Sequence, residues 1–182
     1  SRGRLAGKVA LVTGAGSVGP GWGNGRAIAV RFAEEGARVY GVDRDPERLT
    51  ETARLIAEAG GIFAGDTCDV TRSESIAAMV ARCVAAFGRI DVLVNNVGGS
   101  AKGGPVEMSE EIWDAQIDHN LKSVFLTCKH VLPHMLAQGS GAIVNISSTS
   151  GMRWTGAAQI AYAATKAGVI QFSRVLAVQY AK

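Results

Sequence analysis

Apolar residues in this chain follow two kinds of pattern. Short apolar runs lie at residues 9–13, 38–43, 62–66, 92–95 and 142–146, and longer stretches with apolar residues every three or four positions separate them. The short runs predict buried strands, and the longer stretches predict amphipathic helices. We expect helices at 25–35, 46–59, 109–137 with an interruption near 118–120, and 158–180, together with one that Thr71 caps and that ends near Phe87.

Strand and helix alternate five times, which predicts the α/β class: a doubly wound parallel sheet with helices on both faces, the three-layer Rossmann arrangement. Because crossovers are right-handed, the first strand is expected at the centre, with the second and third on one side and the fourth on the other. No linker or repeat divides residues 1–182, so we expect a single domain. Such a fold ordinarily continues past the last predicted helix to another strand, so we expect a sequence truncated at its C-terminus.

The composition supports a packed core and excludes several classes of protein. Of the 182 residues, 47% are hydrophobic and 19% are charged, which excludes a disordered chain. The net charge is +3 and the basic residues are scattered, so we expect neither a nucleic acid nor a membrane surface as a partner. No stretch approaches the roughly 18 apolar residues of a membrane span, and we expect a cytoplasmic protein.

Cysteine and histidine positions give no indication of a metal site. The cysteines are far apart in the sequence, and none is paired with a second metal ligand at a suitable spacing: Cys68, Cys83 and Cys128. The histidines are not spaced as a metal-binding set either: His119, His130 and His134. We therefore expect reduced thiols and no bound metal.

A glycine-rich segment, residues 13–25, joins the first predicted strand to the first predicted helix. The diphosphate of a dinucleotide needs main-chain amides at a helix N-terminus and no Cβ atom in the way, which is what glycines at this place provide. Asp43 ends the second strand, where a carboxylate can accept hydrogen bonds from the adenosine ribose and would repel a 2′-phosphate. Arg44 argues the other way, since a guanidinium there could bind that phosphate. The sequence thus favours NAD over NADP.

Together these residues resemble the short-chain dehydrogenase/reductase family. Its TGxxxGxG motif is similar to Thr13-Gly14 followed by Gly23-Asn24-Gly25, if residues 18–22 are an insertion of five. Asp69-Val70 resembles the family's pair beside the adenine, and the segment 95–98 resembles its NNAG motif, with Val for Ala. The resemblance implies a dinucleotide-binding domain whose cofactor residues are Gly14, Ser17, Asn24, Gly25, Asp43, Arg44, Asp69, Val70, Asn96, Val97, Gly98, Tyr162 and Lys166.

Tyr162 and Lys166 are four residues apart in the last predicted helix, so they lie on one face of it. An ammonium near a phenol favours the phenolate, and such a phenol can exchange a proton with an alcohol or carbonyl oxygen. A YxxxK pair alone is usually part of a helix surface, but this one follows the fifth strand, downstream of a dinucleotide turn. In the family, the matching Tyr is the general acid/base and the matching Lys also holds the nicotinamide ribose.

Two further polar residues match the family's catalytic set. The segment 145–148 resembles its NxSS pattern, which implies that Ser148 hydrogen-bonds the substrate oxygen and that Ser147 is structural. Ser148 lies 14 residues before Tyr162, one more than the usual family interval, and this spacing would favour Thr149 instead. The place of Ser148 at the end of the strand favours Ser148. Asn120 resembles the asparagine that holds a water linking the Lys to solvent, and the stripe formed by Ile117, Val124 and Phe125 predicts that it is buried.

The resemblance implies an oxidoreductase that transfers a hydride between NAD(H) and a secondary alcohol or ketone, as a homotetramer or homodimer. It also implies that the C-terminal strands and the substrate-covering loop are missing from residues 1–182. Two alternatives stay open: a 3-oxoacyl-(acyl carrier protein) reductase that uses NADP(H), and a non-catalytic dinucleotide-binding sensor. The substrate is a small molecule, and the pocket is expected at residues 99–104, Met152, Arg153, Trp154 and Gln159, where the apolar side chains favour an apolar or cyclic compound.

Overall fold

A computed structural model describes residues 3–181 and contains a five-stranded sheet of order β3-β2-β1-β4-β5. The strands are β1 Val9–Thr13, β2 Arg38–Asp43, β3 Ile62–Thr67, β4 Val92–Asn95 and β5 Ala142–Asn145. The pairs β1–β2, β1–β4 and β2–β3 are parallel. The predicted strand order is therefore confirmed, with β1 at the centre of the sheet.

The helices are α1 Asn24–Glu34, α2 Pro46–Glu58, α3 Ser73–Phe87, α4 Glu110–Ile117, α5 Ser123–Gln138 and α6 Ile160–Tyr180. A π-helical turn, Asp118–Lys122, separates α4 from α5 at the predicted interruption, and a 3₁₀ turn, Thr149–Gly151, precedes α6. Most boundaries lie within two residues of those expected. The prediction that Thr71 caps α3 is wrong: Arg72 is the N-cap, and the Thr71 hydroxyl donates to the Asp69 carboxylate at 2.6 Å.

The described chain forms two compact units. The first unit comprises the described residues up to Asn96 together with Leu126–Val144, and it contains the sheet. The second unit comprises Val97–Phe125 and the described residues from Asn145 onward. The expectation that residues 1–182 form a single domain stays a prediction.

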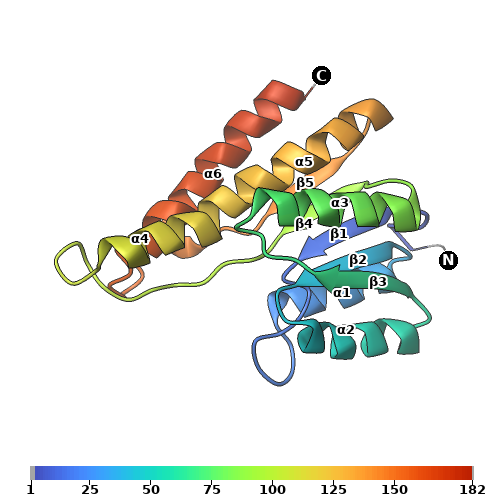
Figure 1. Ribbon diagram of the computed structural model, residues 1–182, viewed down its shortest axis with the longest axis horizontal. Coiled ribbons are helices and arrows are strands. Elements are labelled where there is room, and N and C mark those ends of the chain that lie inside the picture. Colours follow the sequence, from blue (N-terminus) through green and yellow to red (C-terminus); the bar gives the residue numbers. More distant parts are fainter. Residues whose placement is uncertain (1–2, 182) are drawn as a thin grey trace. The chain divides into compact units, whose positions relative to one another are not determined.

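In the first unit, helices α1 and α2 cover one face of the sheet and α3 covers the other (Figure 1). Helix α5 lies beside α3, because the side chains of both line one groove. Every residue of β1 is buried, since this strand has a neighbour on each side and helices on each face. Buried strands of this kind place the loops that follow β1 and β2 at one edge of the sheet, where ligands of open α/β sheets bind.

In the second unit, helix α6 contacts α4, the π-helical turn and the 3₁₀ turn. Gly151 allows the 3₁₀ turn to approach α6 closely: a Cβ atom added there would lie 2.6 Å from the main-chain nitrogen of Ala167. A larger residue at position 151 would push the turn away from the helix. The close approach thus places Ser148, just before the turn, near the helix that carries Tyr162 and Lys166.

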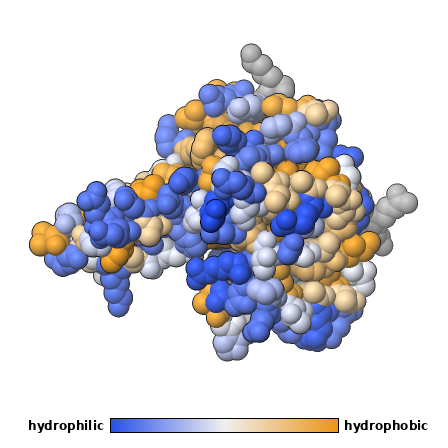
Figure 2. Space-filling view, viewed as in Figure 1, coloured by the Kyte–Doolittle hydropathy of each residue, from blue (hydrophilic) through white to orange (hydrophobic). Residues whose placement is uncertain are grey.

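No helix within residues 3–181 has the length and apolar character needed to cross a bilayer. Hydrophilic side chains are interspersed with apolar ones over the face shown in Figure 2. The three cysteines are buried and free. Among the described residues, no group of three or more His, Cys, Asp or Glu side chains could hold a metal ion.

Candidate nucleotide-binding loop and catalytic residues

The glycine-rich loop between β1 and α1 is packed closely against the start of α1. Gly14 adopts a positive φ of 62°. A Cβ atom added to Gly25 would lie 1.7 Å from the carbonyl oxygen of Gly14, and one added to Gly16 would lie 2.4 Å from the Cβ atom of Arg48. Because main chain or a side-chain stem occupies these positions, only glycine fits at 16 and 25. The first turn of α1 therefore begins directly against the loop that follows β1.

Asn96 connects the end of β4 to this loop. Its side-chain amide donates to the carbonyl oxygen of Gly14 at 3.1 Å, and its main-chain nitrogen donates to the Thr13 hydroxyl at 3.1 Å. The Thr13 hydroxyl in turn donates to the carbonyl oxygen of Val94 at 3.3 Å. The structure thus brings together three of the predicted cofactor residues, Gly14, Gly25 and Asn96, across the carboxyl ends of two adjacent strands.

Asp43 lies at the carboxyl end of β2 and is bonded to the same loop. Its carboxylate accepts hydrogen bonds from the main-chain nitrogens of Gly16 at 3.3 Å and Asp45 at 3.2 Å. The Arg48 guanidinium lies 3.9 Å from it, while the Arg44 side chain is exposed. A half-buried carboxylate at this edge is suited to accept hydrogen bonds from ribose hydroxyls.

The first turn of α1 suits a diphosphate. The N-cap, Gly23, has no side chain that could occupy the amides of the first turn, and the first turn carries no acidic residue. The amides and the positive end of the helix dipole therefore face the loop without a competing carboxylate. The residues present thus fit a dinucleotide cofactor.

The remaining predicted cofactor residues have varied surroundings. The Ser17 hydroxyl donates to the carbonyl oxygen of Gly19 at 2.9 Å, and Asn24 is the first residue of α1. Asp69 accepts from the amide of Thr71 at 2.9 Å, and Val70 is buried. Residues 18–22 form the outer part of the loop, where Trp22 is 64% exposed.

Tyr162 and Lys166 lie on one face of α6, as predicted. The Lys166 ammonium is 5.7 Å from the centroid of the Tyr162 ring. It donates to the main-chain carbonyl oxygen of Ile146 at 2.8 Å, and the side chain is only 3% exposed. Burial lowers the pKa of the Lys166 ammonium, because desolvation disfavours its charged form.

Asn120 is fully buried in the π-helical turn between α4 and α5. Its amide oxygen accepts from the nitrogen of Gly99 at 2.9 Å, and its amide nitrogen donates to the oxygen of Gly99 at 2.9 Å and to Gln116 at 3.2 Å. The predicted burial is confirmed, but the predicted stripe is wrong in one member, since the Phe125 side chain is half exposed. Hydrogen bonding to the 98–99 segment, rather than an apolar stripe alone, fixes Asn120.

Gly98 lies between Asn120 and Lys166. A Cβ atom added to Gly98 would lie 3.0 Å from the Lys166 ammonium nitrogen and 3.3 Å from the Asn120 amide oxygen. The absence of a side chain therefore lets these two polar groups share one small region. The second unit thus holds Asn120, Gly98 and Lys166 together.

The hydroxyls after β5 have different environments. The Ser147 hydroxyl donates to the main-chain oxygen of Lys166 at 2.8 Å, which agrees with a structural role. Ser148 is half-buried, and its hydroxyl oxygen accepts from the nitrogen of Ser150 at 3.2 Å, while Thr149 is exposed. Since Ser148 uses its oxygen as an acceptor here, its proton can be donated to another oxygen.

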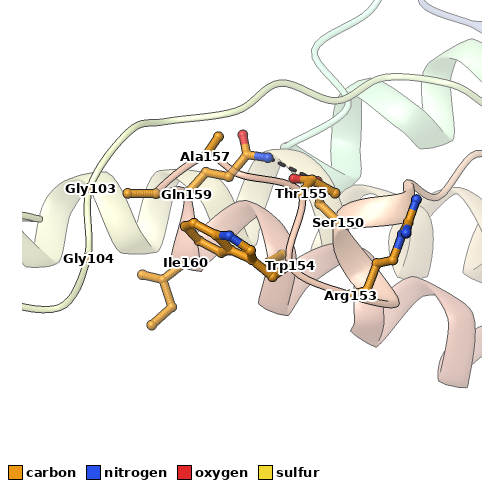
Figure 3. Close-up of a pocket in the computed structure, with 11 residues that line it drawn as sticks. Gly103, Gly104, Ser150, Arg153, Trp154, Thr155, Ala157, Gln159 and Ile160 are labelled. Atoms are coloured by element: carbon orange, nitrogen blue, oxygen red, sulfur yellow. Dashed lines mark hydrogen bonds between the residues drawn. The ribbon is translucent and has the colours of Figure 1, made fainter.

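A cavity of about 360 Å³ lies in the second unit, between residues 103–104 and the segment that leads into α6 (Figure 3). Its predicted lining residues Arg153, Trp154 and Gln159 are present, with Gly103 and Gly104. Met152 and residues 99–102 do not line this cavity, and their place at the edge of a substrate pocket stays a prediction; Met152 is exposed. The Gln159 side chain points toward Ser150 and donates to its hydroxyl at 2.9 Å, with Arg153 at the opposite end from the glycines (Figure 3).

Three contributors to the second unit were not singled out from the sequence: Gln116, Gly151 and the carbonyl of Ile146. Gln116 is four residues before Asn120, a spacing that places two amides on one helical face, and could have been found this way. Gly151 and the Ile146 carbonyl act through contacts distant in sequence, for which a single sequence carries no signal.

The family model described as short chain dehydrogenase matches residues 8–182. Ketoacyl reductase 1 of the granaticin polyketide synthase of Streptomyces violaceoruber is 42% identical over 182 residues, covering 99% of this chain and 65% of the relative. The 3-oxoacyl-[acyl-carrier-protein] reductase of Thermotoga maritima is 41% identical over 178 residues, covering 98% and 70%. The chain therefore spans about two thirds of the length of these relatives.

Solved structures are similar over nearly the whole chain. One from Burkholderia xenovorans, described as a short-chain dehydrogenase/reductase, is 62% identical with a TM-score of 0.97 and covers 98% of this chain and 71% of its own. The structure of actinorhodin polyketide ketoreductase with NADPH is 41% identical with a TM-score of 0.88, and the match covers 94% of this chain and 64% of that one. The structure of NAD⁺-bound xylitol dehydrogenase is 33% identical with a TM-score of 0.90, and the match covers 98% of this chain and 66% of that one. The chain belongs to the short-chain dehydrogenase family.

Proposed function

We propose that this protein is an NAD(H)-dependent oxidoreductase that interconverts a secondary alcohol and a ketone. The observation that carries the proposal is the pairing of Tyr162 with a buried Lys166, whose ammonium is fixed by the Ile146 carbonyl. An ammonium fixed beside a phenol stabilises the phenolate, so the phenol can give up and take back a proton during the reaction. Because the chain spans about two thirds of the length of its relatives, the proposal concerns the activity of the whole protein.

The nicotinamide of the bound cofactor supplies or accepts the hydride. In the reductive direction, Tyr162 donates its phenolic proton to the carbonyl oxygen as the carbon gains the hydride, so that a ketone becomes an alcohol. Ser148 donates a hydrogen bond to that oxygen and stabilises its developing negative charge. Lys166 stabilises the phenolate left on Tyr162, and Asn120 supports the proton relay from Lys166 to solvent.

Cofactor binding is assigned to the loop after β1 and to the ends of the neighbouring strands. The residues are Gly14, Ser17, Asn24, Gly25, Asp43, Arg44, Asp69, Val70, Asn96, Val97 and Gly98, together with Tyr162 and Lys166. The position of the Asp43 carboxylate at the end of β2 supports NAD, because it would repel a 2′-phosphate. One similar structure holds NADPH and another holds NAD⁺, so assays with both cofactors measure the preference.

Reduction of a 3-oxoacyl thioester is the second candidate function. Two relatives that are 41–42% identical are named as a ketoacyl reductase and a 3-oxoacyl-[acyl-carrier-protein] reductase, which favours it. The same Tyr, Lys, Ser and Asn would carry out the reaction. A non-catalytic sensor would bind the dinucleotide without turnover. A homotetramer or homodimer stays the expectation from the family resemblance.

The experiment is an assay of the purified whole protein on cyclic ketones, aliphatic ketones and 3-oxoacyl thioesters, each with NADH and with NADPH. Tyr162→Phe removes only the proton-donating oxygen, and Tyr180→Phe on the same helix is the matched control. We expect turnover that falls at least 100-fold in Tyr162→Phe and is unchanged in the control. Cofactor binding without turnover of any compound by the wild type would favour the sensor.

A further inference from the structure

Arg26 is a buried arginine beneath the glycine-rich loop for which the proposed reaction has no use. It lies in the first turn of α1 and is only 6% exposed. Its guanidinium donates to the Thr52 hydroxyl at 3.2 Å, to the carbonyl oxygen of Arg48 at 3.3 Å and to the carbonyl oxygen of Gly21. All three acceptors are neutral oxygens, so these bonds hold main chain and hydroxyl in place.

Thr52 extends the reach of Arg26 to the other end of the loop. The Thr52 side chain is fully buried on α2, where its hydroxyl accepts from Arg26 and donates to the carbonyl oxygen of Ala15 at 2.9 Å. Arg26 therefore links Ala15, at the start of the loop, with Gly21, near its end. Both contacts are anchored to α2, because Thr52 and the Arg48 carbonyl belong to that helix.

The outer part of the loop has few other supports. Cβ atoms added at Gly19 or Gly21 would meet nothing within 4 Å, and Val18 and Trp22 are largely exposed. The Ser17 hydroxyl bonds only to Gly19, two residues away. A loop of this composition is flexible unless it is tied to the body of the protein, and Arg26 provides a tie at Gly21.

We propose that Arg26 is a positioning residue that clamps residues 15–21 to α2 and so keeps the glycine-rich loop in the conformation that receives the cofactor's diphosphate. This inference rests on the proposed function, since it concerns the same cofactor. Without the clamp, the loop must be ordered when the cofactor binds, which weakens binding. The chemical step depends on other residues and is not altered once the cofactor is bound.

The first test compares the dissociation constant of NADH, or of NADPH if that is the better ligand, in the wild type, Arg26→Met and Arg26→Lys. We expect both variants to bind the cofactor about tenfold more weakly, because the hydrogen bonds of the Arg26 guanidinium are lost. We expect kcat at saturating cofactor to stay within about twofold of wild type. Arg31→Met, at an exposed arginine on the same helix, is the control and should bind normally. Full binding by Arg26→Lys would show that charge alone matters and would overturn the clamp.

A double-mutant cycle separates the clamp from a general packing role. Deleting residues 18–22 removes the Gly21 acceptor, so Arg26→Met should cost less than about threefold in cofactor affinity in the shortened protein. An equal cost with and without residues 18–22 would contradict the proposal. If Arg26→Met does not fold, Thr52→Val against Thr52→Ser tests the Ala15 link, and only the valine variant should lose affinity.

Chymotrypsin gives a readout that does not depend on the cofactor. Trp22 is an exposed cleavage site in the loop, so cutting after it should become several times faster in Arg26→Met than in the wild type. An unchanged rate would contradict the clamp. If the wild type binds neither NADH nor NADPH, the proposed function is refuted. The cleavage rate then tests the clamp by itself.

Discussion

The Lys166 ammonium donates to the main-chain oxygen of Ile146 at 2.8 Å, so a catalytic candidate on α6 is held by the backbone just after β5. The bond fixes one of the three protons of the ammonium and holds the nitrogen 5.7 Å from the Tyr162 ring centroid. Because a main-chain oxygen has no alternative rotamers, the position of the ammonium depends on the path of the strand end rather than on another flexible side chain.

Replacing Lys166 by methionine should abolish most of the turnover. The variant nearly keeps the length of the side chain but removes the ammonium that, in the proposed reaction, stabilises the phenolate, so we expect kcat to fall at least 100-fold. Steady-state assays with saturating cofactor measure the effect. Lys122→Met, at an exposed lysine paired with Asp118, is the control and should retain full activity.

Replacing Asn120 by alanine should destabilise the protein as well as slow it. Asn120 is fully buried, and alanine would leave both the nitrogen and the oxygen of Gly99 without their partner. Each lost hydrogen bond costs about 1 kcal/mol, so we expect the free energy of unfolding to fall by about 2 kcal/mol, which urea unfolding can measure. An unfolding free energy within about 0.5 kcal/mol of wild type would contradict the buried network.

Asp43→Asn should shift cofactor preference. Loss of the carboxylate removes its repulsion of a 2′-phosphate and leaves Arg48, now 3.9 Å from Asp43, to attract that phosphate. We expect kcat/KM to fall about tenfold with NADH and to rise with NADPH. Asp66→Asn, near the end of the adjacent strand β3, is the matched control and should leave the ratio unchanged.

The buried thiols should be unreactive in the folded protein. Burial raises the pKa of Cys83 to about 12 and that of Cys128 to about 11, from an ordinary value of 9.0. The raised values mean that their contribution to stability is complete below pH 9 and is lost as pH rises toward 11 and 12, because the unfolded thiols ionise first. A thiol reagent at pH 8 should label these cysteines only after denaturation, and Cys83→Ala should lessen the loss of stability above pH 9.

The fold followed from the sequence because strands and helices carry local signals. The buried run of β1 and the right-handed crossovers were sufficient to predict its central place. The prediction at Thr71 was wrong because its hydroxyl donates to the Asp69 carboxylate, two residues earlier, and does not cap α3. Phe125 satisfied the helical period but faces outward, since periodicity does not say which neighbours are present.

Some residues of the candidate site could likewise be predicted from the sequence, and others could not. Asp43, Tyr162 and Lys166 could be named from their residue types and spacing, and Asn120 from the family resemblance; their roles stay predictions. The Ile146 carbonyl, the fit of Gly98 beside Lys166 and the Arg26–Thr52 pair depend on contacts between segments distant in the sequence. Such contacts involve main-chain atoms or common residue types, and a single sequence does not distinguish them.

Transfer of deuterium from NADH labelled at the transferring C4 position tests the central claim most directly. Product from the best ketone of the panel is analysed by mass spectrometry for the wild type, Tyr162→Phe and Tyr180→Phe, with NADH affinity measured in parallel. The account predicts one deuterium on the carbinol carbon with the wild type and Tyr180→Phe, and at least 100-fold slower labelling with Tyr162→Phe at unchanged affinity. Labelling by Tyr162→Phe at the wild-type rate would contradict the role of Tyr162, and no labelling by the wild type with either cofactor would contradict the proposed reaction.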